Sequence, residues 1–86
     1  MEAFQVHILA SDHPFYEGMC YSLILPTAGG MCGIQAHHSN MITALVPGTL
    51  IYQVQENVSQ EAAVSGGLAK VENGEVLILV DTAERP

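Results

Sequence analysis

The stretch Glu72-Asn73-Gly74-Glu75-Val76-Leu77-Ile78-Leu79-Val80 decides the fold of this chain. Asn73-Gly74 is a pair that a type I′ turn prefers, because both central positions of that turn need positive φ. Val76 to Val80 are apolar without alternation, which is typical of a central strand covered on both faces. The stretch therefore predicts a hairpin that joins a strand over 67–71 to a central strand over 76–80.

Other segments carry weaker strand signals. Phe4, Val6 and Ile8 alternate with polar residues, so a strand over 4–8 places the three apolar side chains on one face. Residues 82–86 are consistent with the first turn of a helix. The remaining predicted strands cover 19–25, 31–35, 41–45, 50–55 and 58–64, with turns at Gly29-Gly30 and Pro47-Gly48 and a polar loop over 36–40.

The spacing of these signals indicates the fold class. No segment shows a helical period of useful length, and turn signals recur about every ten residues, as in all-β sandwiches and barrels. A chain of 86 residues has room for one core. We therefore predict an all-β fold, an antiparallel β-sandwich of two sheets, in one domain over residues 1–86.

Charge and composition exclude several classes of partner and location. Nine acidic residues against Lys70 and Arg85 give a net charge of −7, which repels a nucleic-acid backbone. No apolar run approaches the roughly 20 residues of a membrane-spanning helix. The N-terminal residues lack the pattern of a secretory signal, so we expect a cytoplasmic product with reduced cysteines.

Candidate chemical groups are few. His37-His38 suggests a metal site, but adjacent residues of an extended segment point to opposite faces, and no zinc-type spacing supports the pair. Cys20 and Cys32 lie in apolar surroundings, which favours core packing over a hydrolase nucleophile. The glycine pairs match no phosphate-binding loop. We expect no enzyme and no cofactor; a stand-alone metal- or small-molecule-binding β-barrel that uses His37 and His38 is the alternative.

Two segments resemble the epsilon subunit of bacterial F-type ATP synthases. In residues 63–85, Ser65-Gly66-Gly67, the Asn73-Gly74 hairpin and Asp81-Thr82-Ala83 resemble the family's Ser-Gly-Gly strand, hairpin and final strand. In residues 33–48, Gly33-Ile34, His38, Thr43-Ala44-Leu45 and Pro47-Gly48 are similar to a second family segment. The resemblance spans nearly the whole chain.

This resemblance implies a sandwich of about ten strands. It also implies a non-catalytic rotor subunit of the central stalk that links the gamma subunit to the ring of c subunits and couples ion transport to ATP synthesis. The expected location is the cytoplasmic face of the cell membrane, where the protein is peripheral. The isolated domain would be able to self-associate through its vacant interface.

The resemblance also implies contact residues. Those expected near the polar loops of the c ring are Met31, Cys32, Gly33, Ile34 and Gln35. Those expected to face gamma are His38, Met41 and Thr43.

The sequence departs from the family in two places. The family's Pro-Gly-His-Ala-Pro loop reads Ala36-His37-His38-Ser39-Asn40 here, so we expect a less rigid loop. An acidic residue of the family is replaced around Met31-Cys32, which removes an expected charge contact with the ring. The sequence stops at Pro86, ahead of the family's C-terminal helical hairpin, so we expect neither ATP binding nor inhibition by such helices.

Overall fold

The computed structural model describes residues 2–11 and 13–86, which form ten strands and no helix. No helix in this part of the chain is therefore long and apolar enough to cross a membrane. The strands are β1 (Phe4–Ala10), β2 (His13–Cys20), β3 (Ser22–Thr27), β4 (Gly30–Ile34), β5 (Met41–Leu45), β6 (Gly48–Gln55), β7 (Val58–Val64), β8 (Gly67–Glu72), β9 (Glu75–Val80) and β10 (Ala83–Glu84).

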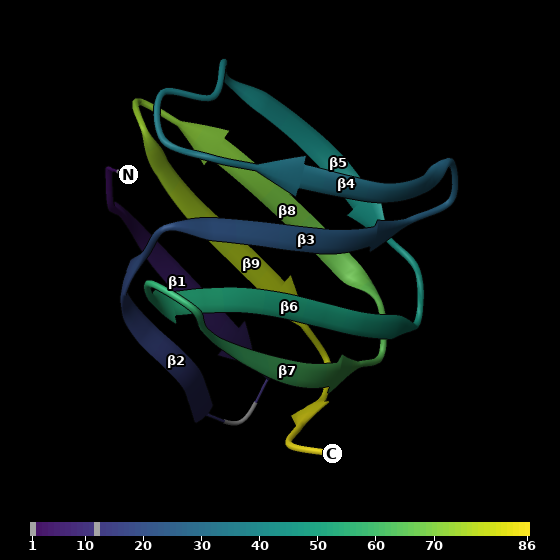
Figure 1. The fold of residues 1–86 in the computed structure, drawn as a ribbon. Coiled ribbons are helices and arrows are strands. Elements are labelled where there is room, and N and C mark those ends of the chain that lie inside the picture. Colours follow the sequence, from purple (N-terminus) through teal and green to yellow (C-terminus); the bar gives the residue numbers. More distant parts are fainter. Residues whose placement is uncertain (1, 12) are drawn as a thin grey trace.

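The strands lie in two layers that cross one another (Figure 1). One layer has the order β5-β8-β9-β1-β2, and the other contains β3, β4, β6, β7 and β10. Among the described strands, the layers are joined through β3 and β5, where Thr27 pairs with Leu45 and the Val46 N–H donates to the Pro26 carbonyl at 3.0 Å. The predicted all-β sandwich is confirmed. Hydrogen bonding nevertheless runs through both layers, so the two predicted sheets form one continuous sheet that folds over itself.

The strand β9 occupies the centre of its layer, as the apolar run predicted, but only one of its faces is covered, since Leu79 is exposed. It pairs antiparallel with β8 through the Asn73-Gly74 turn, in which Asn73 has φ 52° and Gly74 φ 81°. On its other side it pairs with β1 in parallel, with Val6 opposite Val76 and Ala10 opposite Val80. The expectation of antiparallel pairing therefore holds for the pair β8–β9 but not for the pair β1–β9.

The core lies between the layers and is mostly aliphatic, with Phe4 and Tyr52 as its aromatic members. Alternate residues of β1 and β9 point inward, and the buried set includes Val6, Ile8, Val76 and Ile78. Leu23, Leu25 and Ile34 face them from the other layer. No polar or charged residue of the described chain is buried. Burial of each large apolar side chain in the core contributes about 2 kcal/mol, so the core provides the main driving force for folding.

Two predicted elements are wrong at the ends of the sheet. The strand predicted over 19–25 is split at Tyr21, whose backbone N–H donates to the Gln53 carbonyl at 2.8 Å, and residues before it form β2. Pro14 and Gly18 within β2 hid that strand, because both residue types weaken a strand pattern. Residues 82–86 begin no helix; Ala83 and Glu84 instead pair with Val64 and Ala63.

Aromatic packing fastens β2 onto β6. The Tyr52 ring is buried, with its centroid 4.8 Å from the Tyr16 ring and 6.5 Å from the Phe15 ring. The Tyr16 hydroxyl donates to the Met19 carbonyl at 2.8 Å. Burial raises the pKa of Tyr16 to about 12, and the neighbouring Cys20 adds to the rise. The Tyr16 phenol is therefore neutral over the ordinary pH range where it packs against Tyr52.

The Tyr16 environment predicts a late phenol titration. Because the folded pKa of about 12 exceeds the ordinary value of 10.0, Tyr16 contributes stability below pH 10 that is lost as the pH rises toward 12. In an ultraviolet titration, the difference between wild type and Tyr16→Phe should have its midpoint at about pH 12. A midpoint near the ordinary value of 10.0 would contradict this environment.

The backbone of β8 at Gly67 lies close to β9. Its φ is 155°, and a Cβ added there would lie 1.9 Å from the Leu79 carbonyl oxygen. We therefore predict that Gly67→Ala lowers the free energy of unfolding by about 3 kcal/mol, measured by urea denaturation. Gly33→Ala is the matched control, because an added Cβ meets nothing within 4 Å there; an equal loss in both variants would refute the prediction.

Candidate interaction surface

The outer side of the layer that contains β9 is apolar. Leu79 points outward between the inward residues Ile78 and Val80 and is 44% exposed. The register places Leu79 beside Leu68 on β8, and Leu68 beside Ala44 on β5. On the other side Leu79 pairs with Leu9 of β1. An apolar row therefore crosses four neighbouring strands.

A second row widens this surface. Ile42 is 68% exposed, and Leu77 lies across the sheet on the same outer side. We call the set the apolar face; it consists of Leu9, Ile42, Ala44, Leu68, Leu77 and Leu79. The first row is contiguous, whereas Lys70 of β8 lies between Ile42 and Leu77 in the second row. Exposed apolar rows of this kind mark surfaces that a partner covers.

Two ion pairs involve side chains on this side of the sheet: Lys70 lies within the second row, between Ile42 and Leu77, and His7 lies beside Leu77. Lys70 Nζ lies 3.2 Å from Glu72 Oε1, and His7 Nδ1 lies 2.9 Å from Glu17 Oε2. These side chains are partly exposed, so each pair contributes little to stability. The apolar face therefore combines a continuous apolar row with charged side chains beside it, a mixture that is common in protein interfaces.

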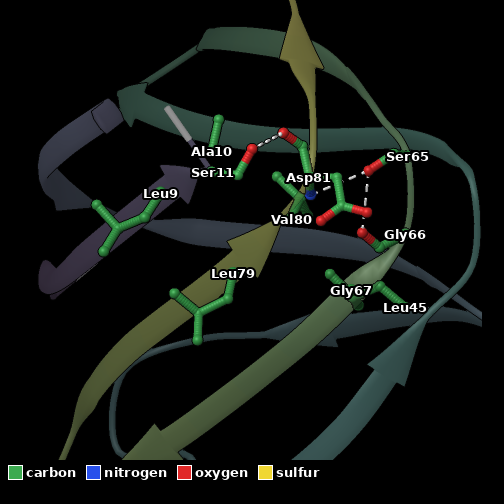
Figure 2. A pocket seen from close by; sticks show the side chains of 10 residues that line it. All are labelled: Leu9, Ala10, Ser11, Leu45, Ser65, Gly66, Gly67, Leu79, Val80 and Asp81. Carbon is green, nitrogen blue, oxygen red and sulfur yellow. Dashed lines mark hydrogen bonds between the residues drawn. The ribbon is translucent and has the colours of Figure 1, made fainter. Parts of the chain in front are cut away.

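A pocket of about 610 Å³ opens where β9 ends (Figure 2). Leu9 and Leu79 of the apolar face form part of its wall, and Gly66 and Gly67 contribute backbone. Asp81, the first residue after β9, also lines it and is exposed. The pocket therefore places one carboxylate beside the edge of the apolar face.

The predicted contact residues on β4 divide between two sides. Met31 is 58% exposed, and Gly33 and Gln35 are exposed as well. Cys32 and Ile34 point inward, opposite Leu25 and Leu23, and Ile34 is buried. Among the described strands β4 pairs only with β3, off the main strand path, and the exposure of Met31, Gly33 and Gln35 shows that its outer side is accessible.

His38 lies beside a groove of about 420 Å³ that Ile24, Gly33 and Gln35 also line. Its Nδ1 lies 2.8 Å from the Ser39 carbonyl oxygen. His37 has φ 66° and places Nε2 2.8 Å from Glu2 Oε1. The adjacent histidines thus have different partners. Within residues 2–11 and 13–86, no three His, Cys, Asp or Glu side chains are grouped to hold a metal ion.

The predicted contacts on β5 lie on its inner side. Met41 is half-buried and packs against the core, and Thr43 is half-buried too. Their neighbours Ile42 and Ala44 face outward. Sequence reasoning missed the apolar face because its members become neighbours only through strand register. The available signal was the run over 76–80, which has apolar residues on both sides of the strand.

The family model for the ATP synthase delta/epsilon chain beta-sandwich domain matches residues 3–86. The chain belongs to this family. Named epsilon chains are similar along most of the sequence. The epsilon chain of Synechococcus sp. is 38% identical over 93% of this chain and 57% of the relative. The epsilon chain of Nitrosospira multiformis is 33% identical over 99% of this chain and 61% of the relative.

Solved structures share the fold of this epsilon-family chain. A chain in the Euglena gracilis mitochondrial ATP synthase, solved with OSCP, F1 and the c-ring, matches with a TM-score of 0.91 at 22% identity. That match covers 96% of this chain and 53% of the other. A chain in the central stalk and c-ring structure of the Tetrahymena thermophila enzyme gives 0.82 at 19%, with coverages of 94% and 65%. The present chain thus spans less than two thirds of these relatives.

The two cysteines of this family member differ in environment, which predicts their reactivity. Cys20 is fully buried, and burial raises the pKa of its thiol, so the reactive thiolate is disfavoured. Cys32 on β4 is only half-buried. Under native conditions maleimide should label Cys32 and leave Cys20 unmodified, as measured by mass spectrometry of peptides. Labelling of both cysteines at equal rates would contradict the packing of β2.

Proposed function

We propose that this chain is the sandwich part of a non-catalytic epsilon subunit in the central stalk of an F-type ATP synthase. It links the gamma subunit to the c ring and so couples ion transport to ATP synthesis. Membership of the epsilon family supports this role. The observation that carries it is the apolar face, a row of exposed aliphatic side chains across β5, β8, β9 and β1.

The apolar face is assigned to the gamma subunit. Covering Ile42 and Leu68, which are 68% and 49% exposed, removes apolar area from water and favours association at about 25 cal/mol per Å². Their positions in paired strands keep them ordered before binding, so little conformational entropy is lost. Contacts of Met41 and Thr43 with gamma stay a prediction, and the half-buried position of both favours Ile42 instead.

The outer side of β4 is assigned to the c ring. Met31, Gly33 and Gln35 are exposed there. His38, which was expected to face gamma, lies at the adjoining groove, and its contact with gamma stays a prediction. Cys32 and Ile34 point inward, so they pack beneath β4 and do not contact the ring themselves. Because the c ring spans the membrane, the protein would be peripheral to it, on the cytoplasmic face.

The two assigned surfaces belong to different layers of the sandwich. The apolar face lies on the layer of β5, β8, β9 and β1, whereas β4 belongs to the layer of β3 (Figure 1). The core that joins the layers is mostly aliphatic and closely packed, so force applied at one surface reaches the other with little deformation. This arrangement suits a part that transmits torque.

Substitution on the apolar face tests the proposal. Ile42→Glu introduces a charge that gamma binding would desolvate, and we expect it to weaken affinity for the gamma chain of the same organism at least about tenfold. Affinity is measured by isothermal titration calorimetry. Val58→Glu is the control, because Val58 is also an exposed strand residue, 38% exposed, but belongs to the other layer.

Two results would overturn the proposed function. One is a wild-type protein that fails to bind the gamma chain. The other is equal binding by wild type and Ile42→Glu when thermal melting shows both to be folded. Weak binding by Val58→Glu as well would indicate a different interface.

A further inference from the structure

The pocket at the end of β9 combines an apolar wall with a carboxylate. Asp81 follows Leu79 by two residues, just beyond the end of β9, and both line the pocket. Leu9 pairs with Leu79 and extends the wall. In Figure 2 the Asp81 carboxylate lies toward Gly66 and Ser65. On that side the pocket is lined by the Gly66 backbone and the Ser65 hydroxyl.

Hydrogen bonds fix the backbone that carries this carboxylate. Ser65 Oγ accepts from the Asp81 N–H at 3.2 Å and from the Thr82 N–H at 3.1 Å. It donates to the Gly66 carbonyl at 3.2 Å. On the other side, Ser11 Oγ donates to the Asp81 carbonyl at 3.0 Å. The position of Asp81 is therefore set before any ligand arrives, which lowers the entropic cost of binding.

The cations of this chain are engaged elsewhere. Lys70 pairs with Glu72 at 3.2 Å, and the Arg85 guanidinium lies over the Phe15 ring at 5.5 Å. Within the described ranges, no cation forms an ion pair with the Asp81 carboxylate. Lys70 and Arg85 are the only lysine and arginine of the sequence, which also has four histidines. Since both have partners within the described residues, a basic side chain of a different protein fits the pocket better than one from a second copy of this chain.

We propose that the pocket binds a basic side chain, arginine or lysine, of the partner that covers the apolar face. The aliphatic stem of that side chain lies along Leu9 and Leu79, and its charged end meets the Asp81 carboxylate. Arg and Lys commonly bury their stems on apolar surface in this way. The net charge of −7 favours a basic partner. The proposal rests on the proposed function, because it names the contact that orients gamma on the apolar face.

A partner-free experiment tests the pocket itself. n-Butylguanidinium and n-butylammonium, added separately, should shift the amide resonances of Ser65, Gly66 and Gly67 in a two-dimensional NMR titration. The shifts should disappear in Asp81→Asn, which keeps the size of the side chain and removes its charge. Comparing the two probes distinguishes an arginine from a lysine site, because guanidinium can contact both carboxylate oxygens.

A second experiment uses the gamma chain as the probe. Asp81→Asn should weaken its affinity about tenfold and reduce the dependence of Kd on salt. Glu61→Gln is the matched control, since it removes one exposed negative charge from β7 in the other layer, and it should change Kd less than about twofold. Asp81→Arg should abolish binding, and one Arg→Glu or Lys→Glu change in gamma should restore it.

The outcomes separate the two proposals. If gamma binding requires Ile42 but Asp81→Asn behaves as wild type with all probes, the pocket proposal is overturned and the proposed function stands. If the cationic probes bind in an Asp81-dependent manner and gamma does not bind, the pocket is supported and the proposed function fails. Equal losses from Asp81→Asn and Glu61→Gln would show general charge attraction and overturn the pocket.

Discussion

The strand β9 is the constraint on which the rest of the structure depends. It lies between β8 and β1, so its backbone hydrogen bonds are satisfied on both edges. Its inward residues Val76, Ile78 and Val80 belong to the core, whereas Leu77 and Leu79 reach the outer side. One strand therefore serves folding with one face and association with the other.

This division separates the energetics of folding from those of binding. The inward side chains are out of water in the free protein, and their burial stabilises it. The outward leucines stay partly exposed, so most of their hydrophobic free energy is released only when a partner covers them. Changes such as Ile42→Glu thus act mainly on association. Gly67 does not fit this division. A side chain there would displace the Leu79 carbonyl and so disturb both the inner and the outer side of the β8–β9 pair.

Local signals explain what could be predicted from sequence. The Asn73-Gly74 turn and the apolar run after it act over adjacent residues, and both were confirmed by the hairpin. The parallel pairing of β1 with β9 joins residues near 6 to residues near 76, so no local pattern shows it. β10 has only two residues and forms by pairing with β7. The apolar face was missed for the same reason, since register alone brings Ile42, Leu68 and Leu9 onto one side.

Charge and apolar area contribute to partner recognition at different ranges. The net charge of −7 acts through solvent and attracts any basic protein, but salt screens it beyond about 8 Å at physiological ionic strength. Such attraction speeds encounter without fixing orientation. Asp81 differs because it lies beside Leu79, where a covering partner excludes water and weakens screening. A single carboxylate at the end of β9 can therefore specify how a partner sits on an apolar surface that alone would accept several orientations.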